Sequence, residues 1–137
     1  MWQTYAILSA VFAALTAIFA KIGVGGINSN LATAVRTSVI FLITWGIAFA
    51  TADLREIREI PSKTAAFLVL SGLSTGMSWL FYFKALQLGE ASKVAPVDKL
   101  SVAITIVLAA VFLGEPITAK LAVGGALILC GTLVLAL

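Results

Sequence analysis

The stretch Leu31–Ala52, LATAVRTSVIFLITWGIAFATA, decides the fold class of this chain. It holds one charged residue, Arg36, and is long enough to cross a bilayer, since a spanning helix needs about 20 predominantly apolar residues. Its apolar residues do not alternate with polar ones, as the strands of a membrane β-barrel require. An apolar run of this length has to satisfy its backbone hydrogen bonds within itself, so we predict a transmembrane helix.

Four more stretches share this character, and charged or turn-forming residues separate all five. A turn rich in Gly and Asn follows Lys21, a charged segment with Pro61 covers residues 53–63, and two short loops each hold a Gly-Glu pair. Such residues punctuate apolar segments. The predicted helices are Thr4–Ala20, Leu31–Ala52, Thr64–Phe83, Val94–Leu113 and Leu121–Leu137.

The connections carry local predictions of their own. Thr118 stands where it can cap the last helix, and Pro116 is expected to begin that helix. In the charged segment 53–63, the apolar residues Leu54, Ile57 and Ile60 alternate with charges, which indicates a short amphipathic turn on the membrane surface.

Composition supports an all-α integral membrane protein made of one domain, residues 1–137. Hydrophobic residues make up 61% of the chain and charged residues 11%, against about 25% charged residues in soluble domains. The mean hydropathy is +1.12. The chain has no His and one Cys, which leaves no imidazole base and no Cys/His metal cluster. We therefore expect no cofactor, no metal site and no enzymatic activity, and the net charge of +3 requires no nucleic-acid partner.

The basic residues are split almost evenly between the two sides of the membrane. Orientation follows the Lys/Arg bias of short loops, so a bias near zero allows insertion in both directions. One side receives Arg55, Arg58, Lys63 and Lys120, and the other receives Lys21, Lys84 and Lys93, with Arg36 just inside the second helix. An odd number of spans places the two termini on opposite sides, and two oppositely inserted copies would form a ten-helix inverted repeat. We expect a homodimer, either antiparallel or with all copies inserted one way.

The second half of the chain resembles the five-helix EamA-type unit of the drug/metabolite transporter superfamily. The resemblance rests on Ala91–Val102 (ASKVAPVDKLSV), Leu113–Thr118 (LGEPIT), Gly124–Leu137 (GGALILCGTLVLAL) and Phe81–Leu86 (FYFKAL). It implies a transporter of small organic solutes, and it implies pairing, because most members carry two inverted units in one polypeptide. The first helix lacks the essential Glu of small multidrug exporters, so their proton-for-cation exchange is not carried over.

Charged residues inside the predicted spans are the candidate site. A charge at the centre of a spanning helix costs roughly 2.5–3.5 kcal/mol, and Arg36, Asp98 and Lys99 lie four to six residues inside their helices. We predict that they line a solute pathway within a basic cluster that includes Lys21 and Lys84. The alternative is that the basic side chains extend to the lipid headgroups and Asp98 pairs with one of them. Pro96 either kinks the fourth helix beside Asp98 or lies in its first turn.

Aromatic and small residues complete the candidate positions. Trp79 and Tyr82 belong either to an interfacial aromatic belt or to the wall of a solute cavity. Small residues permit close helix packing in lipid. On this basis Gly72 and Gly76 are predicted to pack within the bundle, and Gly124 and Gly131 to form a seam between two copies.

These observations predict a multi-pass transporter of the cell (inner) membrane. The chain lacks a phosphate-cradling G-x-x-x-x-G-K-S/T loop, so we expect secondary or facilitated transport of a small metabolite by alternating access in a dimer. The second hypothesis is a non-transporting membrane subunit that assembles with a partner.

Overall fold

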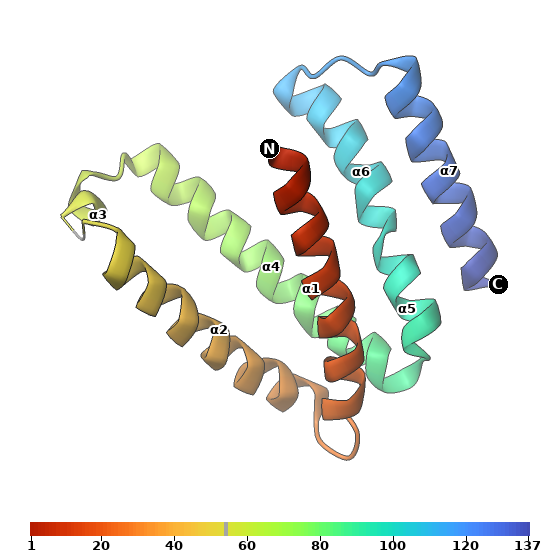
Figure 1. The fold of residues 1–137 in the computed structure, drawn as a ribbon, viewed down its shortest axis with the longest axis horizontal. Coiled ribbons are helices and arrows are strands. Elements are labelled where there is room, and N and C mark those ends of the chain that lie inside the picture. Colours follow the sequence, from red (N-terminus) through yellow and green to blue (C-terminus); the bar gives the residue numbers. More distant parts are fainter. Residues whose placement is uncertain (54) are drawn as a thin grey trace. The chain divides into compact units, whose positions relative to one another are not determined.

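The computed structural model describes residues 1–53 and 55–137, so the predicted role of Leu54 lies outside the described residues. Helices account for most of this part of the chain (Figure 1). They are α1 (Trp2–Gly23), α2 (Ser29–Thr51), α3 (Glu56–Glu59), α4 (Ser62–Leu88), α5 (Ala91–Asp98), α6 (Leu100–Leu108), the π-helical turn η1 (Ala109–Leu113) and α7 (Ala119–Ala136).

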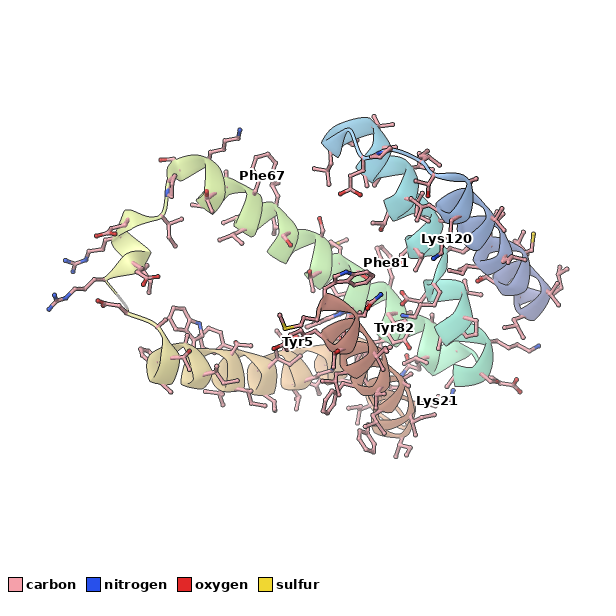
Figure 2. The ribbon with its side chains drawn as sticks, turned by 45° about the horizontal axis from the view of Figure 1, so that its top comes forward. Tyr5, Lys21, Phe67, Phe81, Tyr82 and Lys120 are labelled. Carbon is pink, nitrogen blue, oxygen red and sulfur yellow. The ribbon has the colours of Figure 1, made fainter. Side chains whose placement is uncertain are left out.

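Five helical segments of the described residues are long and apolar enough to cross a membrane, which confirms the predicted fold class. They are Trp2–Gly23, Ser29–Thr51, Ser62–Leu88, Ala91–Leu113 and Ala119–Ala136. No more than 11% of any of the five apolar windows is buried inside the protein. Phe67 and Phe81, for example, project from α4 and are more than half exposed (Figure 2). Side chains of this kind are stable where lipid surrounds them.

All five spans begin two or three residues before their sequence-based starts, and two of them continue past their predicted ends. The helix predicted to end at Phe83 continues to Leu88, and the one predicted to begin at Val94 begins at Ala91. The connection between them shrinks to Gly89 and Glu90, so Lys84 and Lys93 are helical rather than parts of a loop. The predicted ends were placed where charged residues limit the apolar windows. Lysine is a good helix former, however, so a Lys residue does not end a helix.

Local capping explains where several helices begin and end. The Asn28 side chain accepts a hydrogen bond of 2.8 Å from the Asn30 amide at the start of α2. Thr118 caps α7 as predicted, accepting a bond of 3.2 Å from the Leu121 amide. The prediction for Pro116 is wrong, because this residue lies in the extended segment before the cap. Gly114, with φ +68°, ends η1 in the left-handed conformation that favours glycine.

The described residues divide into two compact units, each of which is considered by itself. The first unit comprises Met1–Phe19 and Leu88–Leu137, and the second comprises Ala20–Gln87. In the first unit, α5 and α6 both pack along α7, which returns beside them after the loop at Gly114 (Figure 1). The closest approach of a glycine is at Gly125 of α7, where an added Cβ would lie 3.0 Å from Ile106 Cδ1 of α6.

The second unit has its buried residues at one end. Ala20 and Val24 from the end of α1, Ala32 from α2, and Phe83 and Leu86 from α4 are all less than 9% exposed. From this end α2 and α4 diverge toward the short helix α3, which joins them (Figure 1). The predicted turn in the charged segment is therefore a helix of four residues, with Ile57 and Ile60 exposed.

Candidate functional site

Asp98 and Lys99 lie where the fourth span is interrupted. Pro96 is the sixth residue of α5, so it lies inside the helix and not in its first turn, and the helix ends two residues later. Proline has no amide hydrogen and cannot bond to the carbonyl four residues earlier, so α5 lacks one of its internal hydrogen bonds. At Lys99 the backbone hydrogen bonds span three residues instead of four. The Lys99 amide donates to Pro96 O at 2.9 Å, and the Lys99 carbonyl accepts from the Val102 amide at 2.9 Å.

The two charged side chains at this interruption pair with each other. Lys99 Nζ lies 3.4 Å from Asp98 Oδ2, and the side chains are 53% and 38% exposed, respectively. Adjacent helical residues point about 100° apart, so this contact depends on the length of the Lys99 side chain. An ion pair near a helix break offers both a carboxylate and an ammonium group to a polar solute.

Thr132 of α7 supports the interruption from the neighbouring helix. Its hydroxyl donates to Pro96 O at 3.3 Å, and the residue is 4% exposed. The Pro96 carbonyl therefore accepts two hydrogen bonds, one from the Lys99 amide and one from the Thr132 hydroxyl of the neighbouring helix. Sequence reasoning missed Thr132, although a lone hydroxyl in the apolar run of the last helix was a usable signal.

Arg36 occupies an aromatic site in the second unit. Its guanidinium carbon lies 4.1 Å from the ring centroid of Trp79 and 5.4 Å from that of Phe83. Arg36 Nη1 is buried and has no hydrogen-bond partner among the described residues. The structure thus brings Arg36 and Trp79 together, and it adds Phe83, which the sequence did not single out as a site residue. The four-residue spacing of Trp79 and Phe83 on one helix was the available signal.

Tyr82, Lys21 and Lys84 belong to the same unit. Tyr82 is partly buried on α4, and Lys21 stands at the end of α1 (Figure 2). Lys21 Nζ donates to Leu86 O at 2.7 Å, so its ammonium group satisfies a carbonyl in the last turn of α4. Lys84 Nζ donates to Gln87 Oε1 at 3.2 Å. These bonds give both lysines a structural role at the closed end of the unit, the end where its buried residues lie. The wider basic cluster around Asp98 stays a prediction.

A groove of about 1060 Å³ lies at the other end of the second unit. Its lining includes Trp45 and Ala48 of α2, Ile57 of the connection and Leu68 of α4. Trp45 also stands between Phe41 and Phe49, with ring centroids 6.2 and 5.6 Å away. Sequence reasoning missed this groove, although the four-residue repeat of aromatic residues was visible.

The four glycines predicted for helix packing have open space where a side chain would begin. A Cβ at Gly72, Gly76, Gly124 or Gly131 would meet nothing within 4 Å among the described residues. Gly72 also lines the groove. Their roles within the bundle and between two copies stay predictions.

Comparisons with known proteins agree with this architecture. Residues 1–137 match the EamA-like transporter family. An uncharacterized transporter in the cobO 3′ region of a Sinorhizobium species is 51% identical over 135 residues, which cover 98% of this chain and 96% of that relative. Uncharacterized transporter YvbV of Bacillus subtilis strain 168 is 32% identical over 118 residues, which cover 85% of this chain and 38% of YvbV. No solved structure matches.

Together, the five spans and the match across the whole sequence establish the resemblance seen in the motifs. The chain is a multi-pass membrane protein and belongs to the EamA-like transporter family.

Proposed function

We propose that this protein is a secondary or facilitated transporter of small organic metabolites, working by alternating access as a homodimer in the cell (inner) membrane. The observation that carries the proposal is the interrupted fourth span, where the helix ends two residues after Pro96, beside the ion pair of Asp98 and Lys99. Transporters commonly bind substrate at interrupted helices, because the unwound backbone and nearby charges offer polar partners inside the membrane.

The pairing of two copies has separate support. Family members of this kind are expected to use two five-helix units, and the described residues of this chain hold five spans. Two oppositely oriented copies supply an inverted repeat, and the nearly even split of basic residues across the membrane permits both orientations. We place the pair in an antiparallel arrangement.

The test begins with ligand discovery. A thermal-shift screen of metabolites on the purified chain identifies a ligand, and counterflow of that ligand is then measured in liposomes that contain this chain alone. Transport is expected from the wild type, while D98N should reduce it at least about tenfold, since loss of a charged polar partner commonly costs about 1.5–3 kcal/mol. The matched control E115Q changes an exposed carboxylate in a loop and should transport like the wild type.

Two results would contradict the proposal. Unchanged counterflow in D98N would remove Asp98 from the pathway. A folded, ligand-binding chain without counterflow would instead favour the second function, a membrane subunit that needs a partner.

Orientation is tested separately by cysteine labelling. C130S removes the chain's single cysteine, and L137C then places one thiol at the end of the sequence. A membrane-impermeant thiol reagent should label part of the population in intact cells and the remainder only after permeabilisation. Labelling of all molecules from one side would reject the antiparallel pair.

A further inference from the structure

Arg36 is held inside the membrane-spanning part of the second unit rather than extended toward the headgroups. It is the eighth residue of α2, about 10 Å from the start of that helix at 1.5 Å per residue. A snorkelling arginine would carry its guanidinium to water. Here the guanidinium lies against Trp79 at 4.1 Å, and Nη1 is buried.

The position continues the buried stripe of α2. Ser29 and Thr33 precede Arg36 at helical spacing and are 4% and 5% exposed. The facing stripe of α4 holds Trp79 and Phe83, one turn apart. The guanidinium is thus fixed by the two helices that form the closed end of the unit, which reduces the entropy lost when it binds a ligand.

The charge of Arg36 is not balanced within its own unit. Residues 20–87 contain three carboxylates, Asp53, Glu56 and Glu59, and all belong to the connection after α2. Asp53 lies about 25 Å beyond Arg36 along the helix at 1.5 Å per residue. Burying an unpaired charge in an apolar environment is costly. An anion that binds here therefore supplies the counter-charge that this unit does not place beside Arg36.

The contacts of the guanidinium define how an anion can approach. Stacking on Trp79 uses the face of the planar group, and the N–H donors lie in the plane at its edge, where a carboxylate binds through two parallel hydrogen bonds. Nη1 provides an unused donor at that edge. Tyr82 lies on α4 one turn after Trp79 and is close enough to interact electrostatically with Arg36.

The surroundings select a singly charged, partly apolar ligand. Lys21 and Lys84 direct their ammonium groups to Leu86 O and Gln87 Oε1, while the guanidinium of Arg36 is the charge that lies against the rings of Trp79 and Phe83. A dianion would keep an excess charge in a low-dielectric site, where unpaired charge is unfavourable. Trp79 and Phe83 offer apolar ring surface beside the charge.

We propose that Arg36, seated on Trp79 and Phe83, binds the carboxylate group of a small monocarboxylate solute. This inference rests on the proposed transport function and names the substrate class of its site. It assigns Arg36 the role of anion receptor, with the aromatic rings fixing its orientation.

The test measures binding through Trp79 itself. The chain has three tryptophans, so W2F/W45F leaves Trp79 as the only one. The purified full chain in an uncharged detergent is titrated with monocarboxylates from acetate to octanoate, each paired with the amide of the same chain length. At least one carboxylate should change the Trp79 emission saturably, while its amide, which lacks the charge, should not.

Variants then identify the receptor. R36Q should abolish the response, and R36K, which keeps the charge but loses the planar pair of donors, should weaken affinity by roughly tenfold or more. The matched control R58Q changes an arginine of the exposed helix α3 and should bind like the parent. Thermal unfolding checks that each variant is folded. If R36Q is not folded, R36K is the variant that tests the receptor.

Three results would overturn the inference. They are an equal response to carboxylate and amide, no response to any carboxylate, and unchanged affinity in R36Q. A parallel titration uses short-chain phosphatidylglycerol, and an Arg36-dependent response to this lipid without one to carboxylates would show a headgroup site instead.

The binding assay is independent of flux. Carboxylate binding without counterflow would contradict the proposed function and leave the receptor assignment standing. Counterflow of an uncharged solute that persists in R36Q would contradict the receptor assignment and leave the proposed function standing.

Discussion

Individual residues carry most of the chemistry in this apolar chain, because each polar group in a spanning segment needs a partner. Thr33, Thr37 and Thr75 donate their hydroxyls to carbonyls one turn earlier in their own helices. Thr132 is different, since its hydroxyl reaches across to Pro96 O on another helix. This bond joins the last helix to the interruption beside Asp98, so its loss has a consequence that the local bonds lack.

Thr132→Val should destabilise the protein by about 1 kcal/mol, because it removes a buried hydrogen bond while keeping the shape of the side chain. A lower Tm of the purified chain in detergent is the measurement. Thr105→Val is the matched control, since the Thr105 hydroxyl bonds to Ser101 O within α6 at 2.7 Å. Equal effects of the two substitutions would show that the bond between the helices contributes no more to stability than a bond within one helix.

At the level of helices, apolar windows predicted which segments span, while local chemistry determined where they end. The five spans and the cap at Thr118 were predictable from the sequence. The extension of α4 to Leu88 was not, because Lys21 supplies the donor for Leu86 O from a distant part of the chain. The same limit applies to the candidate site: the sequence singled out Arg36 and Trp79, but their contact depends on how α2 meets α4.

Gly125 of α7 closely approaches the Ile106 side chain of α6. Gly125→Val should destabilise the protein by about 1–3 kcal/mol through overpacking, because an added Cβ lies 3.0 Å from Ile106 Cδ1. Thermal or denaturant unfolding measures the loss, and Ile106→Ala in the same chain should recover part of it. Gly46→Val, where a Cβ meets nothing within 4 Å, is the control. A Gly125 variant as stable as this control would contradict close packing at that point.

For the whole molecule, the exposed faces have to be covered by lipid or by a second copy. The Gly124 and Gly131 faces of α7 are open, which is consistent with the predicted seam between copies but does not test it. Sequence alone could not resolve this point, because small residues serve packing within a chain and between chains equally well.

Gly131→Leu should weaken the dimer, since a bulky side chain keeps two α7 helices from close approach. The dimer fraction is measured by light scattering of the purified chain, with Gly46→Leu as the control for adding Leu at an open glycine. An unchanged dimer fraction in Gly131→Leu would reject this seam.

The central claim is that two oppositely oriented copies form the transporter. Two copies fused in tandem by a short linker are forced into opposite orientations, because each copy has five spans. Inserting one extra spanning helix between the copies forces them parallel. Counterflow by the two fusions in liposomes is the decisive measurement. We predict transport by the short-linker fusion and none by the fusion with the extra helix, and transport by the parallel fusion alone would contradict the account.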